Sequence, residues 1–220
     1  MEPDVSPGPV TRAARARELV GVVLTAVIFA LFARTFLVQA FVVPSSSMET
    51  AVLIGDHLLV NKFVFAPHGR LLANLLPYRE VRRGDIIVFK FPGNPATDFI
   101  KRVVALPGDT VEVRGEAVLV NGTESRTGSK GSSPATEATG EPRVGPIRVL
   151  PDEYFAMGDN RRESYDSRSW GPVPADHLKG RAFLVYWSSD GARPPAGGPL
   201  RDALDRVART RWSRTFRLVR

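Results

Sequence analysis

The chain has 220 residues, 43% of them hydrophobic, which is enough for one domain of ordinary size and a separate apolar segment. It contains no cysteine, so disulfides, thiol catalysis and thiolate metal sites are excluded. His57, His68 and His177 are scattered and lack the spacing of metal ligands. We therefore predict no metal and no other cofactor.

The net charge of +7 is concentrated at the C-terminus, where residues 190–220 hold eight arginines and three aspartates. The rest of the chain is close to neutral, and its aromatic and basic residues do not alternate, so we predict no nucleic-acid partner. Apolar residues among these arginines indicate a basic amphipathic tail on a phospholipid membrane. A poorly ordered tail in solvent is the alternative.

A long apolar stretch follows the first 17 residues, which form an arginine-containing N-terminal tail. Leu19–Ala33 has 15 residues without a charge, and the apolar pattern resumes after Arg34. Since a membrane span needs about 20 residues, we predict one transmembrane helix over residues 18–37, with Arg34 reaching the interface. A cleaved signal peptide, which no small-x-small site supports, and a buried core helix are the alternatives.

The position of the arginines also predicts the topology of this segment. Three arginines precede the apolar run, and only Arg34 follows it before Lys62. Because cytoplasmic flanks are enriched in positive charge, we expect a single-pass protein of the cell (inner) membrane with a cytoplasmic N-terminus. Residues 38–189 then form an extracytoplasmic domain.

Short segments of strand-forming residues, separated by turn residues, fill this domain and predict a mostly-β fold. The predicted strands are Ile86–Phe91, Phe99–Leu106, Val111–Val113, Val118–Val120, Ile147–Leu150, Tyr154–Met157 and Ala182–Trp187. Residues 121–146 are rich in Gly, Ser, Thr and Pro, and we predict a flexible insertion there. The apolar residues 63–76 fit either core or a flap that touches the membrane.

Two residues 54 positions apart indicate chemistry. Ser47 ends a run of three serines, which on composition alone would be a solvated linker, and Lys101 lies in an apolar strand. A serine nucleophile needs a base, and no histidine, Gly-x-Ser-x-Gly or Ser-x-x-Lys motif supplies one. A lysine can serve if burial lowers its pKa from about 10.4 to about 7–8. The alternative is a lysine with a packed stem and a solvated head.

A polar stretch, residues 157–171, supplies further candidates. Asp166 and Arg168 lie two positions apart and suit an ion pair that fixes the shape of this loop. Ser164 is placed to orient the base. A solvated loop is the alternative.

Five segments in order carry a family resemblance. They are Pro-Ser-Ser-Ser-Met at 44–48, Ile-Gly-Asp at 54–56, Gly-Asp-Ile-Ile-Val-Phe at 84–89, Phe-Ile-Lys-Arg-Val-Val-Ala-Leu-Pro-Gly-Asp at 99–109, and Gly-Asp-Asn-Arg-Arg-Glu-Ser-Tyr-Asp-Ser-Arg-Ser-Trp-Gly at 158–171. Together they resemble the boxes of bacterial type I signal peptidases over residues 34–187. The resemblance implies a mostly-β catalytic domain of two antiparallel sheets. It also implies a serine endopeptidase that cuts signal peptides from exported preproteins after an Ala-x-Ala-like site.

The same resemblance implies a role for each matching residue. Ser47 corresponds to the nucleophile and Lys101 to the general base, while Ser45 and the backbone N–H of Ser47 correspond to the oxyanion donors. Ser164 is similar to the residue that holds the lysine amine. The remaining correspondences are the ion pair Asp166 and Arg168 and the small substrate pockets at Val43 and Ile100.

Two departures and two rival interpretations accompany the resemblance. Thr50-Ala51 replaces the family's usual Pro-Thr after the nucleophile, which leaves the following turn less restricted, and Ser46 replaces a frequent glycine. A Ser/Lys self-cleaving repressor-like protease would share the two residues but should carry a DNA-binding segment. A non-catalytic membrane-anchored β-domain has no need of Lys101 in an apolar strand.

Overall fold

The computed structural model describes residues 12–32, 34, 37–62, 65, 79–115, 117–125, 127–128, 143–190, 198, 204–205 and 207–219. The chain divides into two compact units, Met1–Leu37 and Val38–Arg220. Each is described separately below.

The first unit contains the helix α1 (Arg12–Phe32), of 21 residues. It begins before the predicted segment 18–37 and ends at Phe32 rather than at residue 37. Its apolar side chains from Leu19 to Phe32 are exposed within the chain. Across the described ranges, no helix combines the length and apolar character needed to cross a membrane, so the predicted span is not confirmed.

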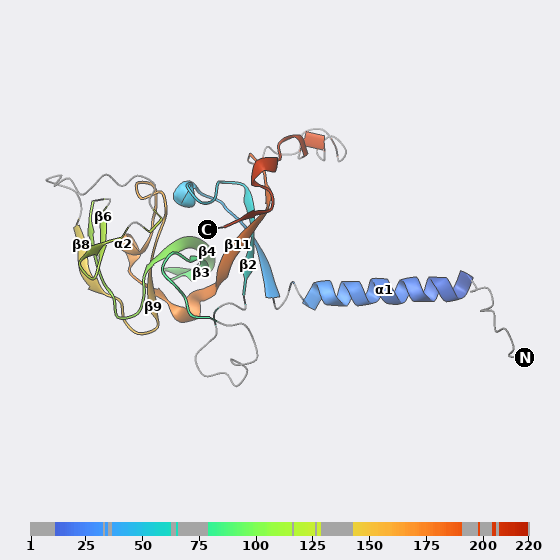
Figure 1. The fold of residues 1–220 in the computed structure, drawn as a ribbon, viewed down its shortest axis with the longest axis horizontal. Coiled ribbons are helices and arrows are strands. Elements are labelled where there is room, and N and C mark those ends of the chain that lie inside the picture. Colours follow the sequence, from blue (N-terminus) through green and yellow to red (C-terminus); the bar gives the residue numbers. More distant parts are fainter. Residues whose placement is uncertain are drawn as a thin grey trace, which may run out of the picture. The chain divides into compact units, whose positions relative to one another are not determined.

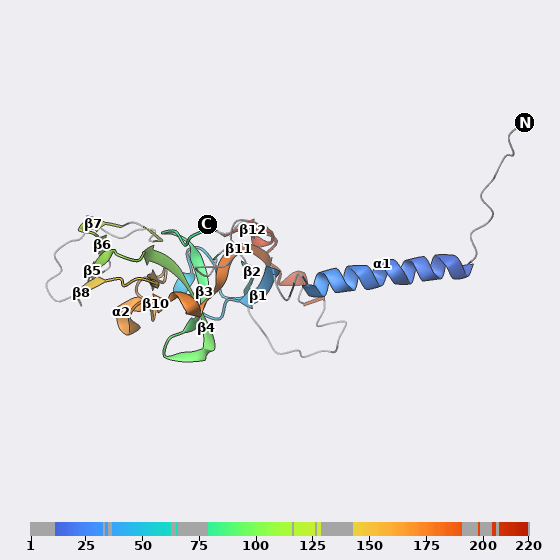
Figure 2. The same cartoon turned by 90° about the horizontal axis from the view of Figure 1, so that it is seen from below.

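The second unit consists of two antiparallel sheets, as predicted for the fold class (Figures 1 and 2). The eight-stranded sheet has the order β1-β2-β11-β3-β4-β9-β10, with β12 paired to β11. Its strands are β1 (Val38–Val42), β2 (Asp56–Asn61), β3 (Ile86–Phe91), β4 (Asn94–Ala105), β9 (Glu153–Met157), β10 (Val173–Pro174), β11 (Leu178–Ser188) and β12 (Arg217–Leu218).

The smaller sheet has four strands in the order β7-β6-β5-β8. It lies at the end of the unit away from β2 and β11 in both views (Figures 1 and 2). Its strands are β5 (Thr110–Arg114), β6 (Ala117–Val120), β7 (Thr123–Glu124) and β8 (Arg143–Arg148). Short helices described in this unit include η2 (Ser46–Met48), α2 (Ser167–Trp170), η3 (Ala175–His177) and η4 (Trp212–Arg214).

Strand β4 connects the hydrophobic clusters of the unit. Its first residues are exposed, whereas Ile100 to Ala105 are all buried. Ile100, Val104 and Val103 enter three different clusters, and the alternation of side chains along a strand separates the neighbours Val103 and Val104. Lys101 therefore lies at the start of the most buried part of the longest strand.

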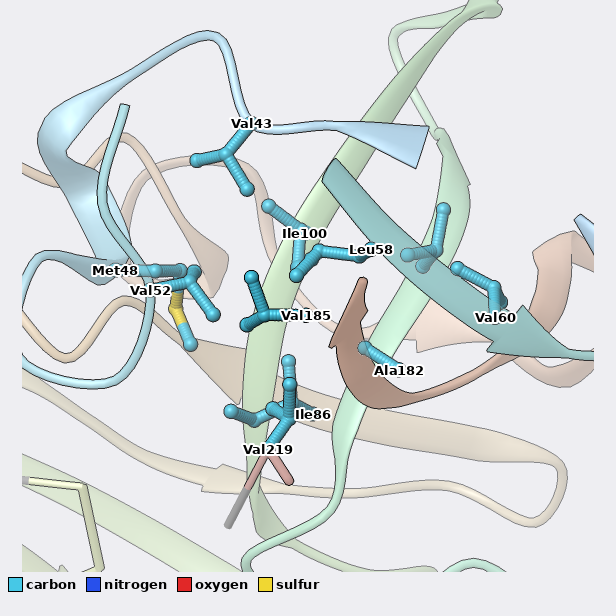
Figure 3. Close-up of a cluster of buried hydrophobic side chains, with 11 residues drawn as sticks. Val43, Met48, Val52, Leu58, Val60, Ile86, Ile100, Ala182, Val185 and Val219 are labelled. Carbon is cyan, nitrogen blue, oxygen red and sulfur yellow. The ribbon is translucent and has the colours of Figure 1, made fainter. Parts of the chain in front are cut away.

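The first cluster positions the serine segment. Val43, Met48 and Val52, which flank Ser47, are each 0–1% exposed. They pack in one cluster with side chains from β2, β3, β4 and β11 (Figure 3). Burying a side chain of this size stabilises the fold by about 1.5–3 kcal/mol. Packing on both sides of Ser47 thus fixes the backbone that carries it.

Several predicted boundaries are wrong. Strand β4 begins at Asn94, five residues before the predicted Phe99, because Asn94 pairs with Phe91 across a tight turn and the β3–β4 hairpin continues. Strand β1 was not predicted. The predicted insertion 121–146 contributes β7 and the first residues of β8 to the smaller sheet, and most of it lies outside the described residues. Of the segment 63–76, only Phe65 is described, and it packs partly buried against the core.

The C-terminal residues belong to the second unit. Strand β12 pairs with β11, and Val219, which is 6% exposed, joins the same cluster as Met48. A tail entirely in solvent is therefore wrong for these residues. Trp212, Phe216 and Leu218 nevertheless remain 57–76% exposed on this segment.

Candidate active site

Ser47 lies in η2, the short helix that follows β1 in the chain. Only 5% of the Ser47 surface is exposed. The backbone N–H of Glu49 donates to the Ser46 carbonyl at 2.9 Å, and that of Val52 donates to Met48 at 2.9 Å. The backbone N–H of Asn160 reaches the Ser47 carbonyl at 3.1 Å. These bonds and the packed neighbours hold the serine in one place.

Lys101 meets Ser47 from β4. Its Nζ donates a hydrogen bond of 2.6 Å to Ser47 Oγ, and the residue is 4% exposed. The side-chain nitrogen lies 5.7 Å from the centre of the Phe99 ring, two residues earlier on the same side of the strand. The structure therefore brings together the two residues that the sequence separates by 54 positions.

The environment of Lys101 favours its neutral form. Burial lowers the pKa of Lys101 from 10.5 to about 8, because a charged amine loses its hydration inside the protein. The carboxylates of Asp166 and Asp159 raise the pKa and Arg168 lowers it, but burial is the largest effect. A neutral amine 2.6 Å from a hydroxyl can accept its proton, which is the task of a general base.

Ser45 lies beside the hydroxyl of Ser47. The two Oγ atoms are 3.3 Å apart, and Ser45 is in extended conformation at the start of η2. The Ser45 side chain makes no capping hydrogen bond to this short helix. Its hydroxyl is thus available near the oxygen of any carbonyl that Ser47 attacks.

Gly158 brings Ser164 and the backbone of Ser47 to one point. A Cβ atom on Gly158 would lie 2.2 Å from Ser164 Oγ and 2.5 Å from the Ser47 carbonyl oxygen. Ser164 Oγ is buried, and none of the described residues meets it at hydrogen-bonding geometry, although the hydroxyl helps to hold Asp166 ionised. The predicted hydrogen bond to Lys101 is not formed, so the role of Ser164 stays a prediction.

Asp166 and Arg168 form a bidentate ion pair. The Arg168 Nε lies 2.8 Å from Asp166 Oδ1, and Nη2 lies 2.9 Å from Oδ2. Burial would raise the pKa of Asp166, but hydrogen bonds from Arg168 and the Gly158 backbone, together with the charge of Arg168 and the nearby Ser164 hydroxyl, outweigh burial and lower it. Arg168 also donates to the carbonyls of Arg161 and Ser164. The pair therefore holds the shape of the polar loop.

A second buried pair underlies the site and was not predicted. Arg102, the neighbour of Lys101, forms two hydrogen bonds of 2.7 Å to Asp159. Arg161 is buried beside it and donates to the Thr127 carbonyl at 2.5 Å. Adjacent residues of β4 thus serve different purposes, since Lys101 faces Ser47 while Arg102 anchors the loop. Only their position within the quoted motifs could have indicated this.

Val43 and Ile100 belong to the same buried cluster (Figure 3). They are 1% and 3% exposed, so their side chains are core residues that pack in one cluster with Met48, the neighbour of Ser47. Their role as pocket residues stays a prediction. Within the described ranges, no group of three or more His, Cys, Asp or Glu side chains is arranged to hold a metal ion.

Comparison with known proteins gives consistent matches. Residues 16–187 match the model of the family described as signal peptidase, peptidase S26. The probable signal peptidase I-2 of Synechocystis sp. is 39% identical over 201 residues, which cover 87% of this chain and 80% of the relative. Signal peptidase I of Pseudomonas aeruginosa is 36% identical over 189 residues, covering 70% and 66%.

Two further matches extend the range of organisms. Signal peptidase I of Aquifex aeolicus is 33% identical over 213 residues, which cover 72% of this chain and 79% of the relative. The crystal structure of a signal peptidase I from Enterococcus faecalis is 31% identical, with a TM-score of 0.39. That alignment covers 47% of this chain and 97% of the other.

Proposed function

Because the chain belongs to the signal peptidase family, peptidase S26, we propose that it removes signal peptides from exported preproteins with Ser47 as nucleophile and Lys101 as general base. One observation carries the assignment of residues. A buried lysine with a pKa of about 8 lies 2.6 Å from the hydroxyl of a buried serine.

The proposed reaction has two stages. Lys101 Nζ accepts the proton of Ser47 Oγ as this oxygen attacks the scissile carbonyl carbon, and a tetrahedral oxyanion forms. Ser45, 3.3 Å from Ser47 Oγ, donates a hydrogen bond to that oxyanion. The protonated Lys101 gives its proton to the leaving amine, which leaves an ester on Ser47. Water, deprotonated by the neutral amine, then hydrolyses the ester and regenerates the serine.

The proposed substrate is a signal peptide cut after an Ala-x-Ala-like site. Support comes from the names of the relatives and from the sequence motifs at Val43 and Ile100, where the family has small pockets. Small side chains at the cleavage site would suit a nucleophile embedded among core residues, since Ser47 is 5% exposed. Larger side chains would require the surrounding core to move.

The proposed location is the cell (inner) membrane, with residues 1–17 in the cytoplasm and residues 18–37 inserted in the bilayer. Support comes from the exposed apolar side chains of α1 and from the three arginines that precede them. Only ten residues separate Leu37 from Ser47, at most about 33 Å of extended chain. A signal peptide's cleavage site also lies just past an apolar segment, so both would be held near one plane.

The C-terminal residues add a second proposed membrane contact. Trp212, Phe216 and Leu218 are exposed, and Arg217 lies between the last two. Aromatic and aliphatic side chains beside arginine suit the boundary between headgroups and acyl chains. This segment, within the tail of residues 190–220, would lie on the membrane surface.

The test is processing of a purified precursor with an Ala-x-Ala site by the full chain in detergent. Ser47→Ala and Lys101→Ala should each remove activity while the far-UV circular dichroism spectrum stays unchanged. Ser213→Ala and Lys90→Ala are matched controls, because both residues are exposed. Processing by either site variant at the wild-type rate would contradict the assignment. Cleavage of the chain itself, with no cleavage of the precursor, would instead favour a self-cleaving protease.

A further inference from the structure

The turn that carries Ser47 is tied to the C-terminal end of the chain. We define the serine turn as residues 46–55 and the C-terminal segment as residues 207–219. The segment reaches the turn by way of β11, since Ser189 pairs with Thr210 and β12 pairs with Leu184 and Val185 of β11. About 160 positions in the sequence therefore separate groups that touch in the fold.

Asp56, at the end of the serine turn, is the centre of this connection. It is fully buried and accepts hydrogen bonds from the Leu53 backbone at 2.9 Å and from Ser188 Oγ at 2.6 Å. Arg214 Nη2 lies 2.7 Å from its Oδ2. Burial would raise the pKa of Asp56, but these hydrogen bonds and the charge of Arg214 lower it. The carboxylate is therefore ionised and fully engaged at neutral pH.

Two arginines of the segment also reach backbone carbonyls inside the turn. Arg214 Nη2 donates to the Ala51 carbonyl at 3.3 Å, and Arg211 Nη2 donates to the Ile54 carbonyl at 2.5 Å. A second bond from Arg211 goes to the Ser189 carbonyl, so this side chain joins β11 to the turn. Arginine suits this task because its planar fork places several donors in fixed directions.

Apolar packing reinforces the connection. Val219 lies in the same buried cluster as Met48 and Val52, and its backbone N–H donates to the Phe183 carbonyl at 2.9 Å (Figure 3). Met48 is the residue after Ser47 and its carbonyl closes the turn by accepting from Ala51 and Val52. The C-terminal segment thus contacts the serine turn in two ways. Val219 packs against core side chains of the turn, and the arginines of the segment donate hydrogen bonds to carbonyls of the turn.

We propose that the C-terminal segment acts as a clamp that holds the serine turn in place. Arg214 is its positioning residue and acts on Ser47 through Ala51 and Asp56. This inference rests on the proposed function of Ser47. The turn contains no proline to restrict its backbone, and its residues Glu49 and Thr50 are exposed. Contacts from Arg214 and Arg211 supply a restraint of that kind from outside the turn.

The expected result is a selective loss of turnover. In Arg214→Ala, kcat falls about 10- to 100-fold, since a shift of about 1 Å in a reacting group has effects of this size. KM changes less than threefold, because the residues that would bind the substrate are untouched. The midpoint of the pH dependence of the rate stays near 8, because Arg214 is not among the groups that set the pKa of Lys101.

Two further variants keep the test decisive if Arg214→Ala folds poorly. Arg214→Lys retains a cation beside Asp56 but lacks the second arm, so we expect a smaller fall in kcat with the midpoint of thermal unfolding close to that of wild type. The double variant Asp56→Asn with Arg214→Gln removes both charges together and so avoids an unpaired buried carboxylate. Ser213→Ala is the control, since Ser213 is exposed on the same segment next to Arg214, and it should retain full activity.

The experiment measures precursor turnover together with the rate at which an acylating serine inhibitor labels Ser47, in the full chain. If wild-type Ser47 is not labelled, the proposed function fails and this inference fails with it. If wild type is labelled and folded Arg214 variants show wild-type kcat and labelling rates, only the clamp is overturned. A fall in kcat that matches the unfolded fraction of each variant would also overturn it. Slower labelling of a fully folded Arg214→Lys protein, with KM preserved, is the supporting result.

Discussion

At the scale of a single residue, the burial of Lys101 and the charges around it determine the pKa of its amine. An ammonium group in an apolar strand loses its hydration, and this loss lowers the pKa of Lys101 to about 8. Asp166 and Asp159 act in the opposite direction, so the amine remains a base strong enough to accept a proton from Ser47. The balance of these two influences keeps the pKa of Lys101 in the range that suits the general-base role proposed for it.

Ser45 provides the first prediction at this scale. Ser45→Ala should lower kcat by about 10²–10³, equivalent to about 2.7–4 kcal/mol, if its hydroxyl donates to the oxyanion. The unfolding free energy should be unchanged, because the Ser45 side chain caps no helix. Steady-state kinetics on a precursor and urea unfolding give the two quantities. Unaltered kcat in Ser45→Ala would exclude the hydroxyl from the oxyanion site.

Gly158 provides the second prediction. Gly158→Ala should lower kcat by about 10²-fold, since its methyl group would lie 2.5 Å from the Ser47 carbonyl oxygen and force the nucleophile's backbone to move. Gly21→Ala is the matched control, because a Cβ there meets nothing within 4 Å. Comparison of kcat for the two variants checks the prediction. Equal activity would show that the contact between the polar loop and Ser47 is not needed for catalysis.

At the scale of elements, the polar loop 157–171 is bonded to both elements that carry the site, to η2 through Asn160 and to β4 through Asp159. Asp166 is fully buried and receives both arms of Arg168. Asp166→Asn should therefore destabilise the fold by on the order of 3 kcal/mol, because it leaves a largely buried guanidinium without its counter-charge. Denaturant unfolding measures the change. A loss below about 0.5 kcal/mol, the level of an exposed pair, would mean that the ion pair does not support the loop.

The elements differ in how well the sequence predicted them. Strand β3 was predicted over its full length, because Ile86–Phe91 combines β-branched and aromatic residues with a turn signal at each end. Strand β1 was missed because Val38–Val42 directly follows the predicted span with no turn residue between them. Strand β12 was missed because its two residues lie among arginines and owe their conformation to β11.

The same distinction applies to the candidate site. The pairing of Ser47 with Lys101 could be predicted, because a lysine in an apolar strand is a local anomaly and the motifs around both residues are specific. Gly158 and Arg214 could not be predicted, since their importance depends on what lies opposite them in the fold. The predicted hydrogen bond between Ser164 and Lys101 is not formed, since the buried Ser164 hydroxyl meets no partner at hydrogen-bonding geometry in the described part of the chain.

At the scale of the whole molecule, membrane attachment yields a prediction that separates the two termini. If α1 is the anchor, the full chain should stay with vesicles after an alkaline carbonate wash, and Val23→Lys combined with Val27→Lys should release it, because lysines inside a bilayer are costly. Leu204→Lys combined with Val207→Lys, two exposed positions near the C-terminus, is the control and should remain attached. Release of the control alone would place the attachment at the C-terminal segment and contradict an α1 anchor.

The central claim concerns the whole molecule as an enzyme, namely that Ser47 is the nucleophile and neutral Lys101 its base. The most direct test is mass spectrometry of the protein after reaction with an acylating serine inhibitor, with the rate of labelling measured from pH 6 to pH 10. Because the folded-state pKa of Lys101 is about 8, the amine is protonated below this pH and cannot accept a proton. We predict one label, on Ser47, at a rate that rises through pH 8 and then levels off, and no label in Lys101→Met. A label on another residue, or a rate on Ser47 that is flat across this range, would contradict the account.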